Sequence, residues 1–252
     1  MKKLIAFDLD DTLAISKSLI SDRMANLLGQ LVDKYEICII SGGKFEQFKI
    51  QVTERLEVSA EQLRKFHLMP TCGTRYYRYD EVKNEWVLLY AEDLTDGQKK
   101  EIITVLEEEA AKTDLKNPKT WGAILEDRQS QIAYSILGQK APPEEKYKWA
   151  EQYGDVKKEF HARVSSRLPN LEVRLGGSTT IDITRLGIDK AYGMEKLIEA
   201  LKISKDEILF IGDKLQEGGN DYPVKAMGID TIAVERWEDT AFVIEGILGA
   251  TA

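Results

Sequence analysis

Short apolar runs bounded by polar residues recur near both ends of this chain. The runs at residues 4–7, 36–43 and 208–211 have the length and composition of strands that are covered on both faces. Amphipathic stretches at residues 21–35, 44–56 and 191–201 carry apolar side chains at helical spacing. Because alternating strands and helices are typical of a mostly parallel sheet, these regions predict an α/β domain.

The middle of the chain has a different rhythm. A capping-box pattern at Thr95 opens a predicted helix to about residue 112, and strands and helices then come in groups. Strand-like runs lie at residues 122–127, 131–137, 171–175 and 179–184, and polar helices at 143–152 and 155–168. This grouping favours an α+β module on an antiparallel sheet. We therefore expect a domain at residues 92–186, inserted into a discontinuous domain formed by residues 1–91 and 187–252.

The first apolar run stops at three acids, Asp8, Asp10 and Asp11. In an open α/β sheet, ligands bind at the carboxyl ends of the strands, so these side chains are expected at the lip of a crevice. Residues two apart lie on the same side of an extended backbone, and repulsion between Asp8 and Asp10 is most simply relieved by a divalent cation. Taken alone, the motif fits a solvated corner between a strand and a loop equally well.

Other polar residues fall at the same expected edge of the sheet. A hydroxyl beside the backbone N–H groups of a glycine turn suits a phosphate oxygen, although most such turns only reverse the chain. A lysine at the start of a helix is, in isolation, an ordinary surface cation. The set in chain order is Ser41, Gly42, Gly43, Lys190, Asp213, Asn220 and Asp221. Together with the first acids, this set is far more specific than any one of its members.

These motifs resemble the haloacid dehalogenase (HAD) superfamily of phosphohydrolases and phosphomutases. The resemblance spans the chain, from DLDDT at residues 8–12 to GDKLQEGGND at 212–221. The segments GIDKAYGMEKL at 187–197 and GDKLQEGGNDYPVKAMG at 212–228 are most similar to eukaryotic-type phosphomannomutases and related sugar-phosphate phosphatases. The resemblance implies a Rossmann-like three-layer α/β/α core with a mostly parallel sheet, and an inserted α+β cap domain of type IIB.

The resemblance also implies a reaction centre with a metal ion. A phosphate monoester is a dianion, so an attacking carboxylate is repelled until cations neutralise the phosphoryl oxygens. Asp8 is the expected nucleophile and would form an aspartyl phosphate. Mg²⁺ is expected to bind through Asp8, the backbone carbonyl of Asp10 and Asp213. Asp221 and Asn220 complete the set around the ion and the phosphate.

The remaining core roles concern protons and phosphoryl oxygens. The resemblance makes the Asp10 side chain the general acid that protonates the leaving oxygen, and then the general base. Ser41 and Lys190 are expected to hold the phosphoryl oxygens, with the glycine turn at residues 42–43 beside them. Lys190 acts as a point charge that also offsets the acids.

Substrate choice is expected to lie in the cap. Aligned with the phosphomannomutase cap, Arg128 falls on a phosphate-binding arginine, and Thr180 and Asp182 fall on a hydroxyl and an acid that contact substrate. Gln139 and Lys146 stand where the mutase pattern has arginines. Since a mutase must grip a second phosphate, and arginine forks suit that grip better than a lysine or an amide, we interpret these departures as favouring a phosphatase of a sugar phosphate or similar small metabolite.

Two alternatives stay open. The nearer one is a phosphomannomutase or phosphohexomutase that interconverts hexose 1- and 6-phosphates with a bisphosphate activator. The other belongs to a different class: a non-catalytic sensor of phosphorylated sugars, or a receiver-like module that is phosphorylated on Asp8 as a signal. Asp10 argues against a receiver, because it supplies the acid/base function that hydrolysis requires.

Composition limits the partners. The chain has 252 residues, and 35 basic against 43 acidic side chains give a formal charge of −8, which argues against a general binder of nucleic acid or anionic membrane. No stretch approaches the roughly 18 apolar residues of a membrane span, and we expect a soluble, unprocessed protein. Cys38 and Cys72 lie in strand-like contexts without metal-ligand spacing, which fits a reducing cytoplasm. By analogy with the mutases, the cap sheet is expected to pair two chains into a homodimer.

Overall fold

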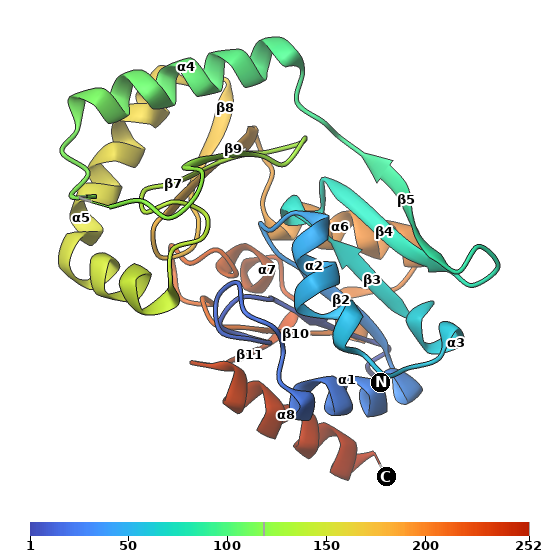
Figure 1. Ribbon diagram of the computed structural model, residues 1–252. Helices are drawn as coiled ribbons and strands as arrows, with labels where there is room; N and C mark the ends of the chain where they lie inside the picture. Colours follow the sequence, from blue (N-terminus) through green and yellow to red (C-terminus); the bar gives the residue numbers. More distant parts are fainter. Residues whose placement is uncertain (118, 252) are drawn as a thin grey trace. The chain divides into compact units, whose positions relative to one another are not determined.

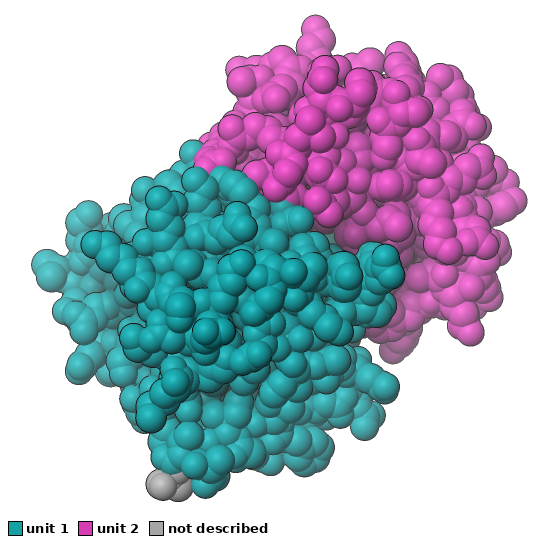
Figure 2. All heavy atoms as spheres, turned by 180° about the vertical axis from the view of Figure 1, so that it is seen from behind, with its two compact units in different colours: residues 1–91, 189–252 teal, residues 92–188 magenta. Residues whose placement is uncertain are grey.

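The structure, a computed structural model, describes residues 1–117 and 119–251 and divides into two compact units. Unit 1 combines Met1–Ala91 with Asp189–Ala252, and unit 2 is Glu92–Ile188 (Figure 2). Unit 2 is thus inserted into unit 1, and its bounds lie within two residues of the predicted 92–186.

Unit 1 is built on one large sheet (Figure 1). Its strand order is β11-β10-β1-β2-β3-β4-β5 in the described part of the chain. Neighbours from β11 to β3 are parallel, and β4 and β5 form an antiparallel hairpin at one edge. The strands are β1 (Leu4–Phe7), β2 (Glu36–Ile40), β3 (Phe66–Met69), β4 (Arg75–Asp80), β5 (Glu85–Ala91), β10 (Ile208–Gly212) and β11 (Asp230–Ala233).

Helices cover both faces of this sheet. Alternate residues of β1 point to opposite sides, so Ile5 and Phe7 pack against α1, α2 and α8, whereas Leu4 and Ala6 pack against α6 and α7. These helices are α1 (Asp22–Lys34), α2 (Phe45–Gln51), α6 (Lys190–Leu201), α7 (Tyr222–Ala226) and α8 (Trp237–Ala250); α3 (Ala60–Leu63) and the 3₁₀ turns η1 (Thr53–Arg55), η2 (Thr71–Gly73) and η3 (Lys205–Glu207) connect them. The predicted three-layer α/β/α architecture is confirmed.

Unit 2 has an antiparallel sheet in the order β6-β7-β9-β8. One face packs against the helices α4 and α5, with Ile181 and Ile183 of β9 in the apolar cluster. Thr180 and Asp182 alternate with them along the strand, so they lie on the opposite face, which carries polar side chains. The elements are α4 (Asp96–Lys112), β6 (Leu125–Asp127), β7 (Ile132–Ser135), α5 (Pro143–Arg167), β8 (Leu171–Leu175) and β9 (Thr180–Arg185).

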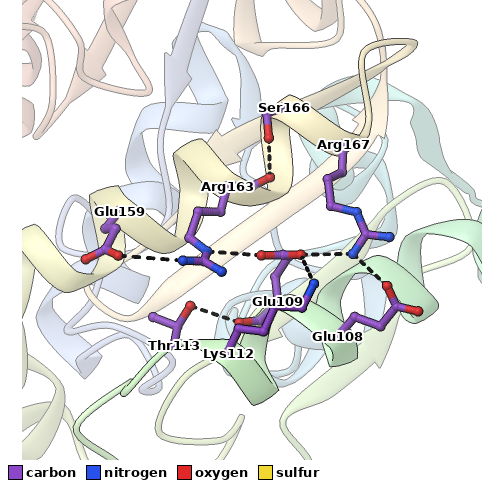
Figure 3. Close-up of polar contacts among 8 residues, drawn as sticks. All are labelled: Glu108, Glu109, Lys112, Thr113, Glu159, Arg163, Ser166 and Arg167. Carbon is purple, nitrogen blue, oxygen red and sulfur yellow. Dashed lines mark hydrogen bonds and ion pairs between the residues drawn. The ribbon is translucent and has the colours of Figure 1, made fainter.

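A buried acid joins the two helices of unit 2 (Figure 3). Glu109 on α4 is 4% exposed and accepts hydrogen bonds from Arg163 and Arg167 on α5, at 3.0 and 2.9 Å. Lys112, one turn further along α4, donates at 2.9 Å. Three cations hold the pKa of this carboxyl at about 2, with the hydrogen bonds from Lys112 and Arg167 as the largest causes.

Three local predictions were wrong. The two polar helices predicted at 143–152 and 155–168 are one helix, α5, bent at Tyr153, where φ is −131° and ψ is 23°. The helix continues because Trp149 before the bend and Phe160 after it pack into the same apolar cluster. The amphipathic stretch 44–56 ends as a helix at Gln51 and continues as a 3₁₀ turn. Cys72 lies in a left-handed turn after β3, with φ of 56°, and not in a strand.

Candidate active site

Three neighbouring strands place candidate catalytic residues at one edge of the unit 1 sheet. β10, β1 and β2 are adjacent and parallel. Asp213, Asp8 and Ser41 each follow directly after one of these strands, at its carboxyl end. The Asp8 N–H also donates to the carbonyl of Ile211 at 3.0 Å, which extends the parallel pairing up to the acid. Residues far apart in the sequence are therefore brought to one edge, where open α/β sheets bind ligands.

Lys190 links acids from both ends of the chain. It is the first residue of α6, whose N-cap, Asp189, accepts from the Tyr192 N–H. Its Nζ lies 2.6 Å from Asp8 Oδ1 and 2.5 Å from Asp221 Oδ1. The Lys190 side chain is only 1% exposed. A lysine buried to this degree needs carboxylate partners, so Lys190 is not an ordinary surface cation.

Burial and neighbouring charges raise the pKa of both Asp8 and Lys190, but for different reasons. Burial raises the pKa of Asp8 well above its usual range; Lys190 lowers it again in part, and the neighbouring Asp221 and Asp213 raise it further. For Lys190, burial acts to lower the pKa, but attraction to Asp221 and Asp8 outweighs it and the pKa is raised. The ammonium is therefore permanent at neutral pH, and the Asp8 carboxylate depends on it and on further cations for its ionised form.

The acids fit a divalent cation. Asp8, Asp213 and Asp221 each present a carboxylate oxygen within 4.8 Å of the other two. Asp213 Oδ1 is buried and has no hydrogen-bond partner within residues 1–117 and 119–251. An unsatisfied buried oxygen is costly, and a hard cation that takes oxygen ligands, such as Mg²⁺, would satisfy it. Asp221 already accepts from Lys190 and, through Oδ2, from the Lys214 N–H at 3.1 Å, so we expect it to orient the site more than to ligate.

Asp10 and Asn220 flank this group of carboxylates. Asp10 is half-buried, and its Oδ1 accepts from the backbone N–H of Lys17 at 2.6 Å. Its side chain does not belong to the acidic cluster among the residues that the structure describes. Asn220 Oδ1 is buried without a hydrogen-bond partner in the same ranges. Two buried oxygens, one on Asp213 and one on Asn220, are thus left for a ligand or a solvated ion to satisfy.

The predicted phosphate turn lies at the end of β2. The Ser41 side chain is 5% exposed, and its Oγ accepts from the Gly43 N–H at 3.3 Å. A Cβ added at Gly43 would come within 2.9 Å of Gln47 Oε1, the side chain that caps the start of α2. Glycine at this position, with Gly42 before it, therefore lets the chain turn tightly from strand to helix.

In unit 2, the candidate residue Arg128 is already paired. It is 5% exposed, its Nε donates to Glu126 Oε2 at 2.9 Å, and its Nη1 donates to Asp182 Oδ1 at 3.4 Å. Thr180 lies two residues before Asp182 on β9, on the same face of the sheet. The structure thus brings Arg128 and Asp182 together.

The two departures from the mutase pattern are also in unit 2. Gln139 is half-buried, and its Nε2 donates to the carbonyl of Ile124 at 3.2 Å. Lys146 lies in the first turn of α5 and is 4% exposed, so it is not a solvated surface charge. A buried ammonium is held by neighbouring polar groups, which limits its reach toward a ligand.

Two polar partners at these sites were missed by sequence reasoning. Lys214 Nζ lies 2.6 Å from Asp213 Oδ2, and its position directly after Asp213 in the sequence could have indicated this pair. Glu126 of β6 pairs with Arg128, which directly follows the strand, and the spacing of two residues is the pattern that could have indicated this pair.

Comparison with known proteins shows which family this chain belongs to. The model of the eukaryotic phosphomannomutase family matches residues 24–249. The chain belongs to this family. Phosphomannomutase of Encephalitozoon cuniculi is 26% identical over 240 residues, covering 88% of this chain and 84% of that protein. Phosphomannomutase of Saccharomyces cerevisiae is 26% identical over 235 residues, with 88% and 84% covered. The HAD resemblance is confirmed, and the protein is an enzyme of that superfamily.

Solved structures share the fold of this phosphomannomutase-family chain. An IMP-bound, truncated IMP-nucleotidase of Plasmodium falciparum has a TM-score of 0.71 at 18% identity, covering 98% of this chain and 68% of that one. A haloacid dehalogenase-like hydrolase of Bacteroides thetaiotaomicron has a TM-score of 0.57 at 17% identity, with 98% and 100% covered. Among the described residues, no helix combines the length and apolar character that a membrane span requires.

Proposed function

We propose that the protein is a magnesium-dependent phosphohexomutase that interconverts the 1- and 6-phosphates of a hexose such as mannose. The observation that carries this proposal is the buried group of Asp8, Lys190 and Asp221 with Asp213 beside it, in a chain of the phosphomannomutase family. The relatives named above are phosphomannomutases, which favours isomerisation over hydrolysis, the function first expected from the sequence.

In the proposed cycle, the enzyme starts with a phosphoryl group on Asp8. A hydroxyl of the hexose phosphate gives its proton to Asp10, and its oxygen attacks the phosphorus. The bond from phosphorus to Asp8 breaks, and a hexose bisphosphate forms. An Asp8 oxygen then attacks the other phosphoryl group, the bond from phosphorus to the sugar oxygen breaks, and Asp10 returns the proton to that oxygen.

The other core residues hold the reacting group in place. Lys190 and the turn at Ser41 are the proposed grip on the phosphoryl oxygens, and Asp221 orients Lys190. A Mg²⁺ ion held by Asp8, Asp213 and the carbonyl of Asp10 would neutralise charge on those oxygens. Catalysis of phosphoryl transfer consists almost entirely of such positioning and charge stabilisation.

A second candidate function is hydrolysis of a sugar phosphate, and one feature of unit 2 favours it. Arg128 is paired with Glu126 and Asp182, and Gln139 and Lys146 replace the arginines of the mutase pattern. A weaker grip on the phosphate of the hexose monophosphate would let this sugar leave before it is phosphorylated again. Water would then attack phosphorylated Asp8 and release inorganic phosphate.

Phosphorus NMR separates the candidates in one experiment. The protein is incubated with mannose 1-phosphate, Mg²⁺ and a catalytic amount of hexose bisphosphate, with the Asp8→Asn variant as control. Conversion to the 6-phosphate without inorganic phosphate supports the mutase. Stoichiometric inorganic phosphate without the 6-phosphate supports the hydrolase instead. Binding of the sugar phosphate without either product would contradict both and support the sensor.

A further inference from the structure

A strained turn follows β3 and has no role in the reaction as proposed so far. Thr71, Cys72 and Gly73 have φ angles of 50°, 56° and 84°, so three consecutive residues are left-handed. A β-branched residue such as threonine is a genuine outlier at positive φ. Backbone strain of this kind persists only where the surroundings hold it, and it gathers at functional sites. The contacts of the turn at residues 71–73 therefore indicate its role.

On one side, the turn is bonded to the phosphate turn at the end of β2. The Thr71 N–H donates to the Gly43 carbonyl at 3.0 Å, and the Cys72 N–H donates to the Ser41 carbonyl at 2.9 Å. Two consecutive amides thus hold both ends of the segment that carries the Ser41 hydroxyl. The left-handed conformation is what points these neighbouring N–H groups in the same direction.

On the other side, the turn touches the backbone of α6. A Cβ added at Gly73 would collide with the Gly193 Cα, and one added at Gly193 would lie 2.7 Å from the Cys72 carbonyl oxygen. Gly193 is three residues after Lys190, which is one helical turn. The Gly73 carbonyl is itself fixed, because it accepts from Tyr90 Oη at 2.7 Å.

We propose that the turn Thr71–Gly73 is a positioning element that sets the separation between the Ser41 turn and Lys190. The inference rests on the proposed function, in which these two groups grip the same phosphoryl oxygens. The turn is a spacer of fixed width, bonded to one gripping element and in backbone contact with the other. A phosphoryl group in the transition state requires both at defined distances, and a displacement of about 1 Å can cost about 100-fold in rate.

Gly73→Ala tests the spacer, and Gly228→Ala is the matched control. Both glycines have positive φ, 84° and 88°, but nothing lies within 4 Å of a Cβ at Gly228. Both variants therefore carry the cost of a left-handed alanine, and only Gly73→Ala pushes α6 away. We expect both to lose thermal stability, and only Gly73→Ala to lower kcat, by about 10- to 100-fold. Titration with orthovanadate in the presence of Mg²⁺ should show a parallel loss of affinity only in Gly73→Ala.

The outcomes separate the inference from the proposed function. If kcat and orthovanadate affinity in Gly73→Ala equal those in Gly228→Ala, the turn is not a positioning element. If the wild-type protein transfers no phosphoryl group and binds no orthovanadate, the proposed function fails first. Should Gly73→Ala not fold, Tyr90→Phe replaces it, with Tyr79→Phe, which loses a hydroxyl bond to Asn84, as its control. Equal kcat in these two variants would also overturn the inference.

Discussion

Replacing Lys190 by methionine removes the cation between two buried carboxylates and keeps the length of the side chain. The ammonium lies 2.6 Å from Asp8 and 2.5 Å from Asp221. At an effective dielectric constant of about 20, each attraction is worth roughly 6 kcal/mol, most of which offsets the cost of taking the ammonium out of water. Removing one partner of a buried pair typically costs about 3–5 kcal/mol. For a unit of this size, that loss corresponds to a midpoint of thermal unfolding roughly 6–20 °C lower.

Differential scanning calorimetry at neutral pH in EDTA measures this loss without interference from divalent cations. Lys49→Met is the control, because Lys49 pairs with Glu54 at 3.7 Å and both side chains are about half exposed, at 44% and 55%. An exposed pair is worth at most about 1 kcal/mol. The double variant Asp8→Asn with Lys190→Met should recover part of the loss, since it leaves fewer unpaired charges. A midpoint for Lys190→Met within about 2 °C of the wild type would contradict this prediction, because no buried charge would then depend on Lys190.

Asp8, Asp213, His67 and Glu109 each carry a further prediction. Asp8→Asn should abolish turnover, and activity within about tenfold of the wild type would contradict this. The same variant should raise the unfolding midpoint at neutral pH, because the pKa of Asp8 is raised in the folded state. Such a carboxyl lowers the stability of the protein as pH rises above its unfolded pKa. Mg²⁺ should raise the unfolding midpoint of the wild type, and much less that of Asp213→Asn, in a thermal shift assay. Burial lowers the pKa of His67, so stability is complete above the unfolded value of 6.5 and falls as pH drops below it, and urea titrations should show this slope reduced in His67→Gln. The pKa of Glu109 is lowered from 4.5 to about 2, so its contribution to stability is present above pH 4.5 and is lost as pH falls toward 2. Thermal unfolding should therefore show that Glu109→Gln destabilises unit 2 more than Glu108→Gln, because the Glu108 carboxylate is half exposed.

Most of the core could be predicted because its signals are local. A buried run such as Leu4–Phe7 has few alternatives to a central strand, and the acids that follow it lie at a strand end by connectivity alone. Parallel strands then place Asp8 beside Asp213 although they are far apart in the sequence. The position of Lys190 could be predicted for the same reason, since α6 begins at this residue, directly after its N-cap.

The missed features depend on contacts that no local pattern encodes. The left-handed Thr71 and Cys72 are held by carbonyls of the Ser41 turn and by the backbone of α6, and neither residue type favours positive φ. The two helices predicted at 143–152 and 155–168 imply a break between them, yet packing of both halves against one apolar cluster keeps α5 a single bent helix. In both cases tertiary packing decides against the local preference.

The same limit applies to the choice between isomerase and hydrolase. An arginine at 128 matches the mutase pattern, but its value as a phosphate grip depends on what else holds it, and Asp182 lies 54 residues away. Because Glu126 and Asp182 already offset its charge, a second phosphate must compete with two carboxylates for one guanidinium. A mutase with this unit 2 therefore has to bind the phosphate of its hexose monophosphate through other side chains on the polar face of the unit 2 sheet. If it binds that phosphate weakly, water hydrolyses part of the phosphorylated Asp8 and inorganic phosphate is released. The ratio of 6-phosphate to inorganic phosphate consequently reports on Arg128, and removing the competing acid in Glu126→Gln should shift that ratio toward the isomer.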